Sequence, residues 1–206
     1  MYSPTYNRLE DRVELLAFMR ANNFALLLTG TGGELHASHL PALIEDRGGR
    51  LYLDMHMAKA NPQWQQFFDD EVLVVFSGPH AYVSPRWYEQ QERVPTWNYA
   101  AVHAYGKVAM VDGHEAKHAA QGRLVRNHDP AWEKAFRTLP PGYLAGMLEG
   151  IVNFEIAVTR LETRWKLSQN RGRREQELIA AELEKSPDSP ARATAVLTRR
   201  HLAEGT

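Results

Sequence analysis

Residues 51–68 read LYLDMHMAKANPQWQQFF, and this stretch decides how the rest of the chain is interpreted. Its apolar residues alternate at first, which predicts a strand from Leu51 to Met57 with one buried face. A polar break follows at Lys59. Asn61 is then a favourable helix N-cap, and Pro62 suits the first helical position, where its missing N–H costs nothing. The polar and aromatic residues from Gln63 to Phe68 have helical spacing, so a strand that turns sharply into a helix is predicted.

This corner has the chemistry of an anion site. The backbone N–H groups at a helix N-terminus, with Lys59 before the cap and His56 at the end of the strand, could hold a phosphate. An ordinary strand-to-helix corner with a solvated lysine explains the same residues. The spacing alone leaves both interpretations open.

The composition is that of a globular protein with a substantial core. The chain has 206 residues, of which 44% are hydrophobic and 24% charged, and its formal net charge of −1 gives no overall case for binding nucleic acid or membrane. The absence of cysteine excludes disulfides, thiolate catalysis and cysteine-ligated zinc. No secretory signal or membrane span is recognisable, so a cytoplasmic protein is expected. We predict one domain over residues 1–185 and a tail over residues 186–206 that either forms a short helix or stays mobile.

Short strands joined by glycine turns dominate the first half. Strands are predicted over residues 24–29, 34–45, 51–57 and 71–77, and Pro41 requires an edge or a bulge in the second of them. Residues 78–88 are predicted as an ordered loop ending in a helical turn, and residues 97–111 as a long strand with a row of small side chains on one face. This pattern favours an antiparallel meander or small barrel over a parallel sheet. Helices are predicted over residues 9–22, 112–137 with an interruption at 128–130, 140–148 and 173–185, and a further strand over 151–159.

Two clusters of residues suggest a possible metal site and a possible phosphate-binding site. His114 and His118 have the spacing of metal ligands on a helix, but no accompanying motif supports a metal, and we predict none. Between Arg160 and Arg174, six basic residues stand against one acidic residue. This cluster could contact nucleic acid, hold the phosphate of a cofactor, or be a solvated connector.

Three blocks of sequence together point to a family: HMAKANPQW, GPHAYVSPRWY…VPTWNYAAVHAYG and IVNFEI…KLSQNR. They resemble the PaiB-type FMN-binding proteins, which are described as negative transcriptional regulators. The resemblance runs from the first residue to about Lys185. It implies the FMN-binding split β-barrel, an α+β and mostly β fold that is antiparallel and Greek-key-like, with flanking helices and a C-terminal helical segment. Pyridoxamine-phosphate oxidases and flavin reductases share this fold. Members are homodimers that hold the flavin at the subunit interface.

The same resemblance implies a set of cofactor-binding residues. The residues expected to bind the phosphate are His56, Lys59 and Asn61, and those expected beside the flavin ring are Ser38, His39 and Leu40. The expected pocket walls are Trp97 and Asn98. A segment of the other subunit is expected to reach in with Lys166, Gln169 and Asn170. No catalytic residue is assigned, although His39, His80 and His103 are candidate proton donors.

Three functions remain possible at this point. The first is a negative transcriptional regulator that acts as an FMN-bound homodimer, through DNA directly or through a regulatory protein partner. The second is an FMN-dependent oxidoreductase or flavin reductase with NAD(P)H as a candidate electron donor. The third and weakest is a haem-handling protein. A fold alone does not choose among them.

Overall fold

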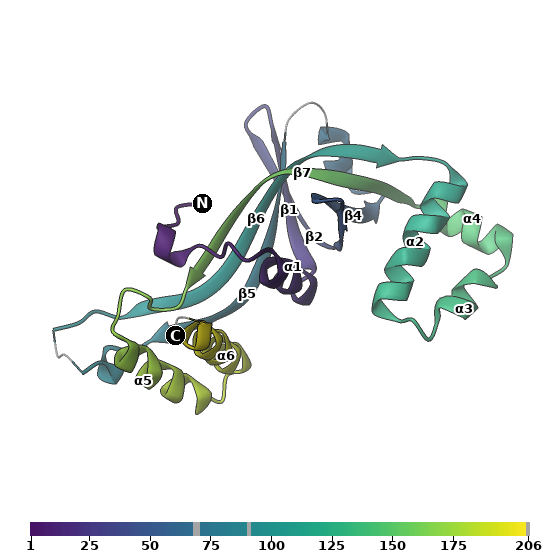
Figure 1. The fold of residues 1–206 in the computed structure, drawn as a ribbon. Coiled ribbons are helices and arrows are strands. Elements are labelled where there is room, and N and C mark those ends of the chain that lie inside the picture. The colour runs from purple at the N-terminus through teal and green to yellow at the C-terminus, as the bar shows by residue number, and fades with distance from the viewer. Residues whose placement is uncertain (68–70, 90–91, 205–206) are drawn as a thin grey trace. The chain divides into compact units, whose positions relative to one another are not determined.

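The computed structural model describes residues 1–67, 71–89 and 92–204 (Figure 1). In this part of the chain, seven strands form one antiparallel sheet in the order β2-β1-β5-β6-β7-β4-β3. The strands are β1 (Phe24–Thr31), β2 (Glu34–Pro41), β3 (Leu43–Arg47), β4 (Arg50–Ala58), β5 (Val72–Val83), β6 (Thr96–Val111) and β7 (Ile151–Lys166). The α-helices are α1 (Arg12–Ala21), α2 (His114–His128), α3 (Glu133–Arg137), α4 (Pro141–Glu149), α5 (Arg173–Glu184) and α6 (Ser189–Glu204). The short 3-10 helices are η1 (Thr5–Asn7), η2 (Pro62–Gln66) and η3 (Pro85–Trp87).

Contacts divide the chain into two compact units, which we describe separately. The first unit consists of residues 1–18, 77–103 and 162–206, and the second of residues 19–76 and 104–161. The second unit contains the β1–β2 and β3–β4 hairpins. Both predicted glycine turns are confirmed: Gly32 and Gly33 have φ of 62° and 89°, and Gly48 and Gly49 have φ of 62° and 88°. These are the left-handed conformations that a tight hairpin turn requires and that glycine adopts without strain.

The single strand predicted over residues 34–45 is wrong, because Pro41 ends it. β2 lies at one edge of the sheet and β3 at the other edge, so the chain crosses the sheet at Ala42. The prediction of an edge strand at Pro41 is confirmed, since proline cannot donate to a ladder. The segment after β4 returns to β2: Asn61 Nδ2 donates to Ser38 Oγ at 2.9 Å. This contact joins β2, at one edge of the sheet, to the segment after β4, which lies next to the strand at the other edge. Such a contact is expected where a sheet curls into a barrel.

β4 confirms the predicted alternation. Its apolar residues Leu51, Leu53, Met55 and Met57 are all buried. The predicted helix after it is shorter and tighter than expected: η2 is a five-residue 3-10 helix, and Phe68 lies outside the described residues. Asn61 is its cap as predicted, because Asn61 Oδ1 accepts from the Gln63 N–H at 3.0 Å.

β5 is longer than predicted. The chain stays extended through Gly78 and Pro79 to Val83, where a loop was predicted, although the helical turn η3 follows as expected. The buried face of β5 changes phase between Phe76 and Ala81, which is typical of a bulge. A Cβ atom at Gly78 would overlap the ring of Phe18 from α1, so only glycine lets helix and strand approach this closely.

β6 has the two faces that its sequence predicts. Residues 98, 100, 102, 104 and 106 are buried, and the alternate aromatic face from Trp97 to Tyr105 is partly exposed. In the second unit, Gly106 packs directly against the backbone of β7, where a Cβ atom would lie 2.5 Å from the Ala157 carbonyl oxygen. The row of small side chains therefore admits a neighbouring strand.

The predicted helices after β6 are confirmed. α2 ends at His128, and α4 begins at Pro141, as the sequence signals indicate. Together with α3 they share a small apolar core of Phe136, Leu144 and Leu148 in the second unit.

The C-terminal tail forms a helix in the first unit. α6 pairs with α5, and both pack on the end of β5 and on η3 through one apolar cluster of Ala81, Val83, Tyr88, Ile179, Leu183, Ala191 and Ala195. On α5, Ile179 and Leu183 are buried, whereas Leu178 is 38% exposed. The strand before α5 is also longer than predicted, because β7 continues to Lys166.

Candidate functional site

The corner after β4 is held rigidly by side-chain hydrogen bonds within the second unit. Gln63, 1% exposed, donates from Nε2 to the Leu27 carbonyl at 3.1 Å and to the His36 carbonyl at 3.2 Å. Trp64 Nε1 donates to the Lys59 carbonyl at 3.0 Å. The corner is thereby fixed to β1 and β2, and this preorganisation requires no ligand.

Lys59 is the exposed cation of this corner. Its backbone N–H donates to the Gly150 carbonyl at 2.9 Å, whereas its ammonium has no partner among the described residues. Ser38 is joined to the same corner through Asn61: its oxygen accepts from Asn61 Nδ2, and its own O–H is available to donate. An ammonium and a hydroxyl on a fixed corner are suitable donors for a phosphate monoester. The donor set therefore fits the phosphate of FMN.

Asn61 and the start of η2 contribute less to an anion site than the sequence predicts. Both side-chain atoms of Asn61 are already bonded, one to Gln63 and one to Ser38. Asn61 therefore positions the corner, and the free charge on it belongs to Lys59.

His56 lies in a different environment from Lys59. Its ring lines a cavity of about 10 Å³ with Asn153 of β7 and Gln121 of α2, which is room for one water at most. Burial lowers the pKa of the His56 imidazole. The ring is half-buried at this place, and its predicted contact with the phosphate of FMN stays a prediction.

The predicted ring-side strand is β2. Leu40 is buried in the core, whereas His39 is exposed and stacks on Phe24, with ring centroids 5.9 Å apart. Phe24 is itself 67% exposed. Ser38, His39 and Phe24 thus give the edge of the second unit a hydroxyl and a flat aromatic pair.

The remaining predicted residues all lie in the first unit, where the structure brings most of them together. Asn98 is fully buried at the start of β6, and its Oδ1 accepts from Ser168 Oγ at 3.0 Å. Its Nδ2 has no hydrogen-bond partner in the described chain. Ser168 has φ of 67°, the one positive value among the described residues other than glycine. No sequence signal marks Ser168, because serine rarely adopts this conformation without tertiary contacts.

The side chains of the other predicted residues in the first unit differ in their hydrogen bonds and in their exposure to solvent. Lys166 donates to Thr96 Oγ1, and burial, with Arg164 nearby, lowers the pKa of its ammonium. Gln169 accepts from the Leu167 N–H at 2.7 Å and donates to the Trp165 carbonyl, so its amide closes the local turn. Asn170 is exposed and Trp97 is 53% exposed.

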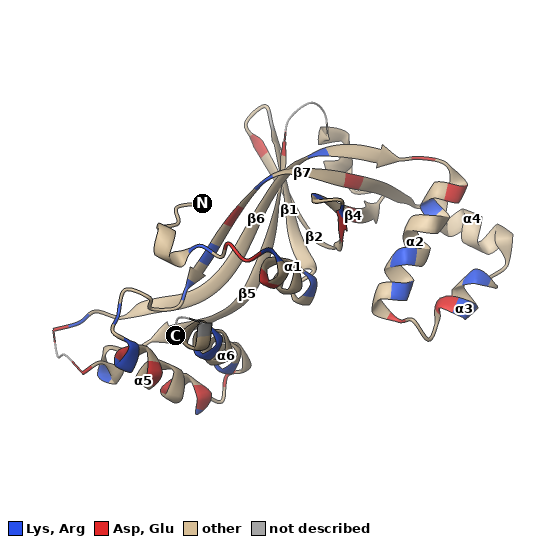
Figure 2. Ribbon diagram, viewed as in Figure 1, with Lys and Arg blue, Asp and Glu red and all other residues tan. Residues whose placement is uncertain are grey.

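Lys and Arg are spread along the chain among Asp and Glu (Figure 2). The basic cluster from Arg160 to Arg174 is largely occupied by contacts inside the protein. Arg160 lies 3.6 Å above the ring of Tyr105, and Arg171 lies 4.8 Å above the ring of Tyr88. Arg164 is buried and donates to the Tyr2 carbonyl. Two further arginines form ion pairs with Glu177 and Glu89: Arg173 and Arg174. These contacts explain the cluster without nucleic acid.

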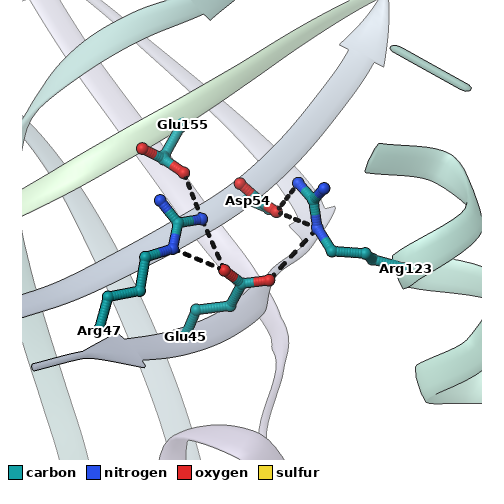
Figure 3. Close-up of polar contacts among 5 residues, drawn as sticks. All are labelled: Glu45, Arg47, Asp54, Arg123 and Glu155. Atoms are coloured by element: carbon teal, nitrogen blue, oxygen red, sulfur yellow. Dashed lines mark hydrogen bonds and ion pairs between the residues drawn. The ribbon is translucent and has the colours of Figure 1, made fainter. Parts of the chain in front are cut away.

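A charge network that sequence reasoning missed joins α2 to the sheet in the second unit (Figure 3). Arg123 Nε lies 3.0 Å from Asp54 Oδ2 and 3.2 Å from Glu45 Oε1. Arg47 Nη2 lies 2.6 Å from both Glu45 and Glu155. Burial and the Glu155 carboxylate raise the pKa of Asp54, while Arg123 opposes that shift. The spacing of these residues gives no signal, because their partners lie on different elements.

The first unit contains two cavities that share His80 and Trp97. One, of about 460 Å³, lies between the β5–β6 end and the α5–α6 pair, and the other, of about 320 Å³, follows Gly78 and Ala100. Four aromatic residues form much of their walls: Tyr82, Trp87, Trp97 and Tyr99. In the described ranges no group of three His, Asp or Glu side chains is placed to hold a metal ion, and no helix there is long and apolar enough to cross a membrane.

Comparison with known families decides the classification. A family model described as "Putative FMN-binding domain" matches residues 1–160. The chain belongs to this FMN-binding family. A relative from Bacillus subtilis, "Protease synthase and sporulation protein PAI 2", is 36% identical over 208 residues, which cover 98% of each chain. FMN is accordingly the cofactor that the family assigns to this chain, and the PaiB resemblance is confirmed.

Solved structures confirm the fold of this FMN-binding family member. The flavocytochrome Anf3 from Azotobacter vinelandii has a TM-score of 0.60 at 16% identity, over 78% of this chain and 69% of that one. The FAD and heme binding protein from Mycobacterium smegmatis has a TM-score of 0.60 at 15% identity, over 78% and 73%. The predicted split β-barrel class, antiparallel with flanking helices, is therefore correct.

Proposed function

We propose that this protein is a homodimeric flavoprotein that holds FMN at the subunit interface and acts as a negative transcriptional regulator through a protein partner. The flavin site rests on one observation: the Lys59 ammonium, which has no partner within residues 1–67, 71–89 and 92–204, lies on a rigid corner to which the Ser38 hydroxyl is bonded through Asn61. In this proposal Lys59 and Ser38 hold the phosphate, Asn61 orients Ser38, and His39 with the backbone of Leu40 borders the flavin ring.

An open apolar face on the second unit supports the homodimer. Directly paired residues share a face of an antiparallel sheet, and Leu26 pairs with Val75 while Leu28 pairs with Leu73. All four are only partly buried, and Leu35 on the neighbouring β2 is 82% exposed. A contiguous exposed apolar face is typical of a protein–protein interface. The residues of the partner subunit that would reach the flavin are Lys166 and Asn170, with Gln169 and Asn98 shaping their segment and Trp97 as a pocket wall.

A partner-mediated role fits the charges better than direct DNA binding. The arginines between residues 160 and 174 are occupied by rings, carbonyl groups and acids of the same chain, and phosphate contacts require free cations. The relative from Bacillus subtilis is named for protease synthase and sporulation, which are cellular programmes, and this name supports a regulatory role.

The regulatory role is tested in cells. Deletion of the gene should raise the level of a defined set of transcripts, and the wild-type gene should restore it. Lys59→Glu should fail to restore it, whereas Lys134→Glu, on an exposed position of α3, should succeed. Transcript levels that do not change on deletion would exclude the regulator. Purified wild-type protein should turn yellow with added FMN whether or not the transcript levels change on deletion.

An FMN-dependent oxidoreductase is the second candidate, because the two cavities at His80 and Trp97 give room for a small molecule. It predicts that NADH or NADPH bleaches the bound flavin and that air restores the colour. His39, exposed beside Ser38, is the proton donor that this function would use. Likeness to haem-binding structures concerns the fold alone, so we do not extend the haem interpretation to this chain.

A further inference from the structure

The larger cavity of the first unit has aromatic walls. Its volume is about 460 Å³, and it lies where β5 and β6 meet the α5–α6 pair. Three large rings line it, from Tyr82, Trp87 and Trp97. Tyr82 and Trp97 stand edge to face, with centroids 6.0 Å apart, and remain 47% and 53% exposed. Their ring surfaces are therefore available to a ligand.

The charges on the cavity wall are predominantly negative. The lining residues include two acidic residues, Glu182 and Asp188, and one lysine, Lys185. Lys185 Nζ lies 2.6 Å from Glu182 and neutralises it. The Asp188 carboxylate has no ion-pair or hydrogen-bond partner among the residues that the structure describes. Its backbone N–H donates to Ser186 Oγ at 3.2 Å, and its backbone carbonyl accepts from the Arg192 N–H at 3.2 Å. In the described chain, one carboxylate without a partner thus lines the cavity together with three aromatic rings.

We infer that this cavity binds an organic cation whose ammonium carries alkyl groups. A quaternary ammonium has no N–H to satisfy, and it gains from contact with aromatic faces and from a nearby carboxylate. A ligand with exposed phosphates, such as a dinucleotide, would place negative charge beside Asp188. A primary amine would need hydrogen-bond acceptors at each N–H, which aromatic rings do not supply as well.

The second cavity adds room for an apolar tail. It is about 320 Å³ in volume, shares His80 and Trp97 with the first, and is bordered by Gly78, Ala100 and Ala101. These residues have little or no side chain, so the floor is flat and apolar. Trp97 borders both cavities and can contact the head and the tail of one ligand. The inference goes beyond the proposed flavin site, with which this cavity shares Trp97.

Calorimetric titration of the full-length, FMN-loaded protein tests the inference. The probes are choline and its neutral isostere, in which carbon replaces the quaternary nitrogen. Choline should bind about tenfold more tightly than the isostere, because only its charge differs. Trp97→Leu should weaken choline binding about tenfold, and Asp188→Asn should weaken it and reduce its dependence on salt.

Trp132→Leu is the matched control, since Trp132 is 43% exposed and lies in the second unit. It should bind choline like the wild type. Equal binding of choline and the isostere, absence of choline binding, or unchanged binding by Trp97→Leu would each overturn the inference. Competition between FMN and choline would assign the cavity to the flavin and would also overturn it, while leaving flavin binding itself intact.

Discussion

Arg123 shows how a single residue can connect elements that are distant in sequence. From α2 it reaches Asp54 on β4 and Glu45 on β3 (Figure 3). Asp54 is 7% exposed, so loss of Arg123 would leave a buried carboxylate beside Glu155. Removing one partner of a buried ion pair costs more than the pair itself contributes.

We expect Arg123→Leu to lower the free energy of unfolding by about 1–3 kcal/mol, because Asp54 then lacks its cation. Urea unfolding followed by circular dichroism measures this change. Adding Asp54→Asn to the same chain should recover part of the loss, since the uncompensated charge is gone. A double variant as unstable as the sum of both single variants would show that the two residues do not interact.

His56 provides a prediction of pH dependence. Burial lowers its pKa from the ordinary value of 6.5, so the unfolded chain binds a proton that the folded chain excludes. The contribution of the neutral His56 ring to the free energy of unfolding is therefore fully present above pH 6.5. It is lost as the pH falls from 6.5 toward the lower pKa of His56 in the folded chain. The pKa of His103 is lowered by burial and shifts stability in the same direction.

Melting temperatures measured between about pH 7.5 and about pH 5.5 should fall for the wild type, and His56→Gln should fall less. His114→Gln, at an exposed position on α2, is the control and should follow the wild type. A slope that His56→Gln leaves unchanged would mean that His56 is protonated as easily in the folded chain as in the unfolded one.

At the scale of residues, local chemistry could be predicted and distant contacts could not. Asn61 was recognised as a cap because its partner, Gln63, is two positions away. Gln169 was predicted to contact a ligand, but its amide bonds the backbone at positions 165 and 167, which depends on the strained turn at Ser168. That Gln169 contacts the flavin stays a prediction.

At the scale of elements, β5 differs most from its prediction, and Gly78 is the reason. Glycine and proline in sequence indicate a loop, but here they allow a bulge that lets α1 pack on the strand through Phe18. β4, β6 and the α2–α4 helices were predictable because their patterns are long and regular. β2 and β3 were not separated, because a sequence does not reveal that the chain changes edges at Ala42.

Gly78→Ala should lower the free energy of unfolding by about 1–3 kcal/mol, since the added methyl group overlaps the Phe18 ring. Gly146→Ala makes a matched comparison, because nothing lies within 4 Å of that position in α4. It should be neutral or stabilising by about 0.5–1 kcal/mol through its greater helix propensity. Thermal unfolding of both variants measures the contrast, and equal effects would show that Phe18 does not occupy the space beside Gly78.

For the whole molecule, the proposed dimer is tested at the open apolar face of the second unit. Leu35→Glu places a charge on that face, where the proposed interface would bury it without a partner. Light scattering should then give the mass of one chain rather than two, and bound FMN should be lost with the dimer. Val13→Glu, at a position 79% exposed on α1, should remain a dimer. A Leu35→Glu protein that stays dimeric would place the interface elsewhere.

In the proposed site Lys59 holds the phosphate of FMN, and comparing FMN with riboflavin isolates this contact. The two ligands share the flavin ring, and only FMN has the phosphate. Fluorescence titration should show that Lys59→Glu weakens FMN binding at least about tenfold and leaves riboflavin binding unchanged, because a charge-assisted hydrogen bond is lost and repulsion replaces it. Lys134→Glu should change neither. Unchanged FMN affinity in Lys59→Glu, or an equal loss for both ligands, would show that Lys59 does not hold the phosphate.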